Sequence, residues 1–266
     1  MVRVHRVAGT AVAAVPGPLR ILVAVAAPEE TRTANAPLDV EAELQAVMDA
    51  VEGLDRSGTV EVRILEVASL GEIVRSLHDV GFHVLHLSGH GSRDGIELED
   101  EDGDPEFVST AELVTGIRRA GRALPMVFLS SCHGGAGGGT GIAAGLVGGG
   151  VGSVLAMQTS ISDAYATLLA RLLYRGLSRP GATPAGALAF ARQTLQADRG
   201  SDRSATWPRP EFAVAMLLGR GTGALVRSWG QMSGAWAAPA LMSFLNTESS
   251  VSPATNPNAT ANSTNV

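Results

Sequence analysis

The feature that most constrains the fold is a series of short, mainly apolar runs separated by segments with helical periodicity. The runs are Leu19–Ala26, Val60–Val67, Phe82–Ser88, Met126–Ser131, Val151–Met157 and Phe212–Leu218. Most of them lack the strict alternation of apolar and polar residues that marks a strand with one face in water. Strands of this kind, alternating with helices, predict an α/β fold with a mainly parallel central sheet flanked by helices.

The segments between the runs supply the helices and one hairpin. Helices are expected at residues 40–54, 69–80, 109–120, 142–147, 162–178 and 183–197. Ser109, with Glu112 three residues later, has the pattern of a capping box. The acidic, turn-rich segment Gly95–Val108 predicts a hairpin.

Charge and composition exclude several classes of protein. The formal net charge is −6, which argues against a nucleic-acid-binding protein. All 20 basic residues are arginine, so the lysine that a P-loop requires is absent. No segment reaches the roughly 18 consecutive apolar residues that a membrane span needs. We therefore expect neither nucleic acid nor a membrane as a partner.

Composition also suggests three parts along the chain. Residues 1–18 are expected to be a leader or linker, because Arg3 and Arg6 precede only a weak apolar stretch and make a poor signal peptide. Residues 19–227 carry the strand and helix pattern. Residues 228–266 lose it, and their polar end is expected to be disordered. A poor signal peptide and a reactive thiol kept reduced favour a cytoplasmic protein.

Two of the predicted strands end in residues that can carry chemistry. One leads into Ser88-Gly89-His90-Gly91, and the other into Ser130-Ser131-Cys132-His133-Gly134-Gly135. Catalytic groups gather at the carboxyl ends of parallel strands, so His90 and Cys132 are expected to lie close together. Cys132 is the only cysteine, which excludes a disulfide within the chain. A thiolate beside an imidazole is a typical pair for nucleophilic catalysis.

These two segments resemble the catalytic signatures of caspase-like cysteine peptidases. Within that group, the chain most resembles the CHAT domain. The likeness covers roughly residues 19–224. It includes Leu19–Ala27, Gly150–Gln158, Ile161–Asp163, the Leu172–Tyr174 helix, Ala187–Gln193, Trp207 and Pro210.

The resemblance implies a caspase-like three-layer sandwich and a cysteine endopeptidase. Cys132 would be the nucleophile and His90 the general base and acid, while the backbone N–H groups of Gly91 and Cys132 would hold the oxyanion. A protein or peptide is the implied substrate, with no cofactor and no metal. Bacterial CHAT domains often stand beside TPR repeats, so control by a TPR-type or other partner, or by an adjacent domain, is expected.

Two residues are candidates for the substrate pocket. Gln158 directly follows the fifth predicted strand, and Asp163 comes shortly afterwards. Asp163 could form an acidic wall for the substrate side chain. The alternative, which we favour, is that Ser162 or Asp163 caps the next helix.

The other histidines near the predicted dyad have simpler interpretations. His83 and His86 lie on the third predicted strand and are interpreted as structural. His133 follows Cys132 directly, and neighbouring residues seldom face each other, so we favour His90 as the partner. A zinc site from His86, His90, Cys132 and His133 is conceivable by residue type, but the spacing of structural zinc ligands is absent.

Two other functions remain open. The first is a signalling or scaffold module whose catalytic residues are idle. The second is a nucleotide-binding flavodoxin-like domain, because Gly139–Ala144 partly resembles a dinucleotide fingerprint. The segment follows the fourth strand rather than the first, so we favour a loop followed by a close-packed helix.

Overall fold

A computed structural model gives the fold for most of the predicted domain. It describes residues 4–8, 12–28, 32–35, 38–52, 58–131, 135, 141–159, 162–201, 215–220 and 223–226. Within these ranges the side chains of Val4, Arg6, Asp163 and residues 198–201 are not described. Cys132, His133 and the predicted disordered tail lie outside the described residues.

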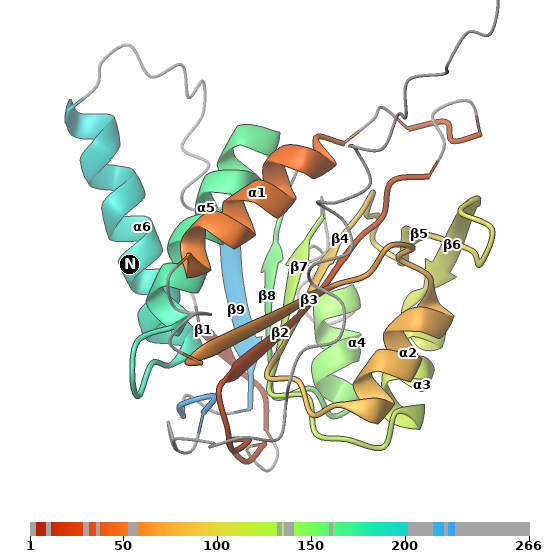
Figure 1. Cartoon of the computed structure of the whole chain (residues 1–266), viewed down its shortest axis with the longest axis horizontal. Helices are drawn as coiled ribbons and strands as arrows, with labels where there is room; N and C mark the ends of the chain where they lie inside the picture. The colour runs from red at the N-terminus through yellow and green to blue at the C-terminus, as the bar shows by residue number, and fades with distance from the viewer. Residues whose placement is uncertain are drawn as a thin grey trace, which may run out of the picture. The chain divides into compact units, whose positions relative to one another are not determined.

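The described residues form a central sheet of seven strands in the order β1-β9-β8-β7-β4-β2-β3 (Figure 1). The strands are β1 (Val4–Arg6), β2 (Leu19–Val25), β3 (Val60–Ile64), β4 (Val84–Ser88), β7 (Met126–Ser130), β8 (Ser153–Met157) and β9 (Ala215–Gly219). All neighbouring pairs are parallel except β8 and β9, which are antiparallel. The prediction of a mainly parallel sheet is confirmed.

Helices cover both faces of this sheet. On one face lie α1 (Val40–Val51), α5 (Asp163–Leu177) and α6 (Pro184–Ser201), and on the other α2 (Leu70–Asp79), α3 (Thr110–Arg119) and α4 (Ile142–Gly148) (Figure 1). Alternate residues of each strand feed the two cores, as Ile21 and Leu22 of β2 show. The arrangement is the three-layer sandwich that the resemblance implied.

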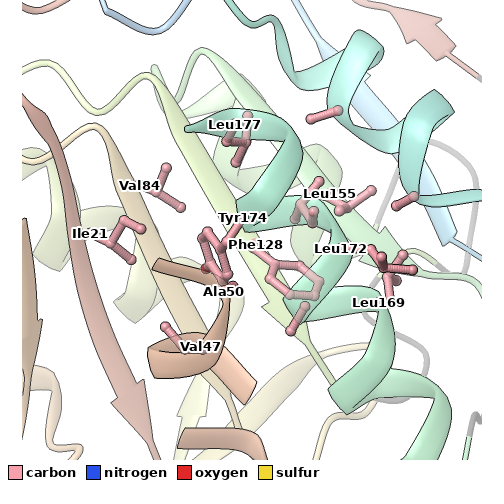
Figure 2. Packing of buried hydrophobic residues seen from close by; sticks show 14 of the residues in the cluster. Ile21, Val47, Ala50, Val84, Phe128, Leu155, Leu169, Leu172, Tyr174 and Leu177 are labelled. Atoms are coloured by element: carbon pink, nitrogen blue, oxygen red, sulfur yellow. The ribbon is translucent and has the colours of Figure 1, made fainter. Parts of the chain in front are cut away.

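The core on the α1 and α5 face is built around aromatic rings. Phe128 of β7 and Tyr174 of α5 lie between Val47 of α1 and Leu155 of β8 (Figure 2). Their ring centroids are 6.3 Å apart in an edge-on arrangement. This core lies directly behind the strands that lead into the predicted catalytic segments.

Local sequence signals explain the element boundaries near the site. Strands β5 (Gly95–Glu99) and β6 (Pro105–Ser109) form the predicted antiparallel hairpin. Ser109 then caps α3, and the capping box is complete: the Glu112 amide donates to Ser109 Oγ, and the Ser109 amide donates to Glu112 Oε2 at 2.9 Å. The last residue of the hairpin is therefore also the N-cap of α3.

Strand β1 departs from the sequence expectation. It lies inside the predicted leader, yet its three residues pair in parallel with β9. Residues 4–6 therefore belong to the sheet rather than to a linker; so short a strand has no periodicity to reveal it. Among the described helices, none is long and apolar enough to cross a membrane.

Candidate active site

The two strands that lead into the predicted catalytic residues are neighbours in the sheet. Strands β4 and β7 run parallel, and their last residues, Ser88 and Ser130, are paired directly. His90 follows Ser88 by two residues, and Cys132 follows Ser130 by two residues in the sequence. The sequence prediction that both segments start from one edge of the sheet is therefore met. The position of Cys132 itself lies outside the described residues, so the Cys132–His90 pairing stays a prediction.

A small pocket lies at these strand ends. Its volume is about 130 Å³, and it is bounded by the start of α1 and the first turns of α5. The lining residues are Leu38, Asp39, Glu43, Ser88, Gly89, His90, Ser130, Ser131, Ala166 and Thr167. Ser131 is buried, and its hydroxyl has no hydrogen-bond partner among the described residues. His90 and the polar residues Ser130 and Ser131 therefore line one pocket.

The His90 segment is held by the β5–β6 hairpin. The Glu97 amide donates to the His90 carbonyl at 2.8 Å, and the Ser92 amide donates to the Gly95 carbonyl at 2.9 Å. Gly91 faces Ile96 between these two bonds. Neither of these two bonds uses the Gly91 amide. An oxyanion donor must likewise not be used up by such pairing.

Gly89 is required by the same close approach. A Cβ on this residue would lie 2.5 Å from the carbonyl oxygen of Glu97, a distance that real Cβ atoms essentially never show. The glycine before the histidine thus lets β5 pack directly against the segment that carries His90.

A buried polar network lies beneath the pocket, and its central residue, Glu43, was not predicted from the sequence. Glu43 Oε1 accepts from His86 Nε2 at 3.0 Å, and Oε2 accepts from the Ser88 hydroxyl at 2.6 Å. Ser88 Oγ also lies 3.2 Å from the Ser130 carbonyl oxygen, and His86 Nδ1 lies 2.9 Å from the Tyr174 hydroxyl. The network joins α1, β4, β7 and α5.

The electrostatics of this network follow from burial and mutual contact. Burial alone would raise the pKa of the Glu43 carboxyl, but hydrogen bonding and charge from His86, with hydrogen bonds from Ser130 and Ser88, hold that pKa below its ordinary value. Burial, followed by the charge of Glu43, raises the pKa of Tyr174. Glu43 is thus an ionised carboxylate inside the protein, and Tyr174 keeps its proton.

A pattern in the sequence marks Glu43. It stands four residues before Val47 and seven before Ala50, on the face that α1 buries. An acidic residue on the apolar face of a helix needs a partner in the core. His86, interpreted as structural, is that partner.

The two candidate pocket residues have other contacts. Gln158 follows β8, and its amide Nε2 donates to Met216 Sδ at 3.3 Å. Asp163 is the first residue of α5, and its side chain is outside the described residues. Ser162 is the N-cap, accepting from the Tyr165 amide at 3.3 Å, as one of the two capping alternatives had it. A role of Gln158 or Asp163 in substrate binding stays a prediction.

His83, the residue before β4, is structural, as its position in the sequence suggested. His83 is buried, receives the Arg20 amide on Nδ1 at 3.0 Å, and contacts the Val15 carbonyl through Nε2 at 3.0 Å. Among the described residues no group of three metal-ligating side chains gathers. His86, a member of the conceivable zinc set, is committed to Glu43 and Tyr174.

Comparison with known proteins places the chain in a family. A family model described as the CHAT domain matches residues 3–242. The chain belongs to the CHAT domain family. No curated protein matches it.

Solved structures similar to this CHAT chain are caspase-like cysteine proteases. A secreted C11 cysteine protease from Bacteroides thetaiotaomicron, solved with an irreversible peptide inhibitor, shares 9% identity at a TM-score of 0.51; the match covers 68% of this chain and 60% of that one. The Arg-specific cysteine proteinase gingipain R shares 13% identity at a TM-score of 0.51, covering 77% of this chain and 46% of that one. The CHAT chain thus spans less than two thirds of either structure, and the likeness establishes the caspase-like fold.

Proposed function

We propose that this CHAT domain is a cysteine endopeptidase in which Cys132 and His90 form the catalytic dyad. The observation that carries the proposal is the pairing of Ser88 with Ser130 at the ends of adjacent parallel strands. This pairing starts the His90 and Cys132 segments from one edge of the sheet. His90 and Ser131, the neighbour of Cys132, line the same pocket.

In the proposed reaction, the thiolate of Cys132 attacks the carbonyl carbon of a peptide bond. The C–N bond breaks as the His90 imidazolium gives its proton to the leaving amine. Water, losing a proton to His90, then attacks the thioester and releases the acid and the free thiol. The Gly91 and Cys132 amides would stabilise the oxyanion that forms in both steps.

Control by a partner or an adjacent domain is part of this proposal. The stretch from Gly134 to Gly141, which follows the nucleophile, has glycine at six of its eight positions. Ordering such a stretch costs about 1–2 kcal/mol per residue, which a bound partner could offset. Turnover of a good peptide substrate by the isolated chain at about 1–10³ per second, with no partner added, would contradict this control.

Covalent labelling tests the proposed chemistry before any substrate is known. A peptidyl electrophile, such as a peptidyl acyloxymethyl ketone, should modify Cys132 with one-to-one stoichiometry, seen by mass spectrometry of the intact chain. The single cysteine makes the site of labelling unambiguous. Labelling no faster than that of a free thiol would favour an idle signalling or scaffold module instead.

Two histidine variants separate the partner from its neighbour. His90→Ala should slow labelling and cleavage by about 10²–10⁴-fold, because one imidazole moves the protons in every step. His133→Ala is the matched control and should have a far smaller effect. The reverse ranking would show that His133 is the catalytic histidine.

A further inference from the structure

We propose that Glu43 is a positioning residue for the dyad, holding the ends of β4 and β7 in register through its bonds to Ser88 and His86. The inference rests on the proposed peptidase function and adds a residue that the dyad alone does not include. It begins from the polar network beneath the pocket, because Glu43 is a buried carboxylate on a helix that packs against a hydrophobic core.

Burying the carboxylate of Glu43 is unfavourable in free energy, which indicates that Glu43 is there for the active site. Both side chains of the Glu43–His86 pair are buried, at 9% and 0% exposure, and no other contact of a carboxylate with Arg or His between described residues is buried on both sides. A buried carboxylate needs hydrogen-bond partners to be tolerated, whereas an apolar side chain of similar volume needs none. Fold stability alone therefore does not explain a carboxylate here.

The placement of the network explains what it can do. Ser88 Oγ is bonded to Glu43 and also lies 3.2 Å from the Ser130 carbonyl, so one hydroxyl ties together the last pair of the two strands. The next residues along each strand lead to His90 and Cys132. A shift of this pair would change the separation of thiol and imidazole directly.

The other side of Glu43 is fixed just as firmly. His86 holds Oε1, is itself held by Tyr174 of α5, and packs against Phe128 with ring centroids 4.8 Å apart. Glu43 therefore cannot move without disturbing both helices that bound the pocket. Glu43 and His90 also line the same pocket.

The groups that face this carboxylate set its electrostatic effect. They are His86 on β4 and Tyr174 on α5, while Asp39 and His90 line the pocket that Glu43 also lines. An imidazolium that is aligned with the thiol favours the thiolate of its partner. A displacement of the β4 and β7 ends after loss of the Glu43 bonds should therefore destabilise the thiolate.

The rate of Cys132 alkylation by iodoacetamide as a function of pH tests this proposal. In the wild-type chain the rate should follow a thiol that ionises well below the ordinary pKa of about 8.5. In Glu43→Gln the midpoint should move upward by about one pH unit, while the rates of the two proteins converge above about pH 9.5 as both thiols become fully ionised. Because an unfolded chain would react as an ordinary thiol, the midpoints are compared where circular dichroism shows both proteins folded. A folded Glu43→Gln protein in which Glu43 served stability alone would keep the wild-type midpoint.

Peptide cleavage gives a second readout. Glu43→Gln should lower kcat by about tenfold to a hundredfold with little change in KM, as expected for a small misplacement of the reacting groups. Glu99→Gln is the matched control. Glu99 is also a buried glutamate, but its carboxylate accepts from the Ala68 amide at 2.6 Å, away from this network.

The outcomes separate the two proposals. A folded Glu43→Gln protein with the wild-type midpoint and kcat would overturn the positioning role and leave the peptidase intact. A wild-type cysteine that titrates as a free thiol, with no cleavage of any peptide, would overturn both. If Glu43→Gln does not fold, Ser88→Ala removes the hydroxyl that joins Glu43 to Ser130 and should shift the midpoint in the same direction.

Discussion

The histidines near β4 show how contacts decide what a residue can do. The Arg20 amide can only donate, so His83 Nδ1 accepts, and the protonated Nε2 donates a hydrogen bond to the Val15 carbonyl. Burial is the main cause that lowers the pKa of His83 to about 4. His83 is therefore a neutral structural residue at neutral pH. His86, three residues further on, is equally buried but faces a carboxylate.

The low pKa of His83 predicts a loss of stability in acid. The unfolded chain takes up this proton near pH 6.5 and the folded chain only near pH 4, so the free energy of unfolding falls as pH drops between these values. His83→Gln keeps a donor for the Val15 carbonyl but does not titrate. Its stability deficit relative to wild type, from urea unfolding, should shrink by about 2 kcal/mol between pH 7 and pH 4.5. A constant deficit would contradict a neutral buried His83.

At the scale of elements, the β5–β6 hairpin and the His90 segment act as one unit. The Glu97 amide donates to the His90 carbonyl, and the Gly95 carbonyl accepts from the amide two residues after His90. Gly89 has no side chain, which allows β5 to pack closely against the His90 segment. The side chain of Glu97 extends the same unit, because it accepts from Thr33 at 2.8 Å and from Asn35 at 3.0 Å. The orientation of His90 thus depends on the hairpin that follows it in the sequence, β5 and β6.

Gly89→Ala tests this dependence. The added Cβ would meet the Glu97 carbonyl at 2.5 Å, so the hairpin or the His90 segment must shift. We expect a destabilisation of about 1–3 kcal/mol and a marked loss of Cys132 labelling. Gly148→Ala in α4 is the control, since nothing lies within 4 Å of its added Cβ. Equal labelling by the two variants would argue against a role of the hairpin in placing His90.

Much of this fold could be predicted because its elements carry local signals. The apolar run at Phe82–Ser88, the capping box at Ser109 and Glu112, and the hairpin at Gly95–Val108 each fix an element without reference to distant residues. The antiparallel pairing of β9 with β8 could not be predicted, because a strand's direction depends on how the chain returns to the sheet. Glu43 was missed because its role depends on His86, 43 residues away.

At the scale of the whole molecule, the CHAT domain is a sheet covered on both faces, with its candidate chemistry at one edge. The helices α1 and α5 that pack on one face also bound the pocket. The cavity of about 800 Å³ between α2, α3 and the hairpin is much larger, but its lining includes neither His90 nor Ser131. A choice of active site by cavity volume alone would therefore have missed the pocket at the ends of β4 and β7.

Deletion of Thr247–Val266 should leave this domain nearly unchanged. The segment is rich in Asn, Ser, Thr, Ala and Pro, and has little apolar surface to bury. The melting temperature and the rate of Cys132 labelling should both stay at the values of the full chain. A fall of several degrees in melting temperature would show that the segment packs against the domain.

The most direct test of the central claim is a peptide-library cleavage profile of the wild-type chain against Cys132→Ala. The substitution changes one small side chain after β7, so the variant should fold with the same melting temperature. We expect cleavage at a defined set of peptide bonds by the wild-type protein and none by the variant. Cleavage that persists unchanged in purified Cys132→Ala protein would contradict the proposal that this CHAT domain is a cysteine peptidase.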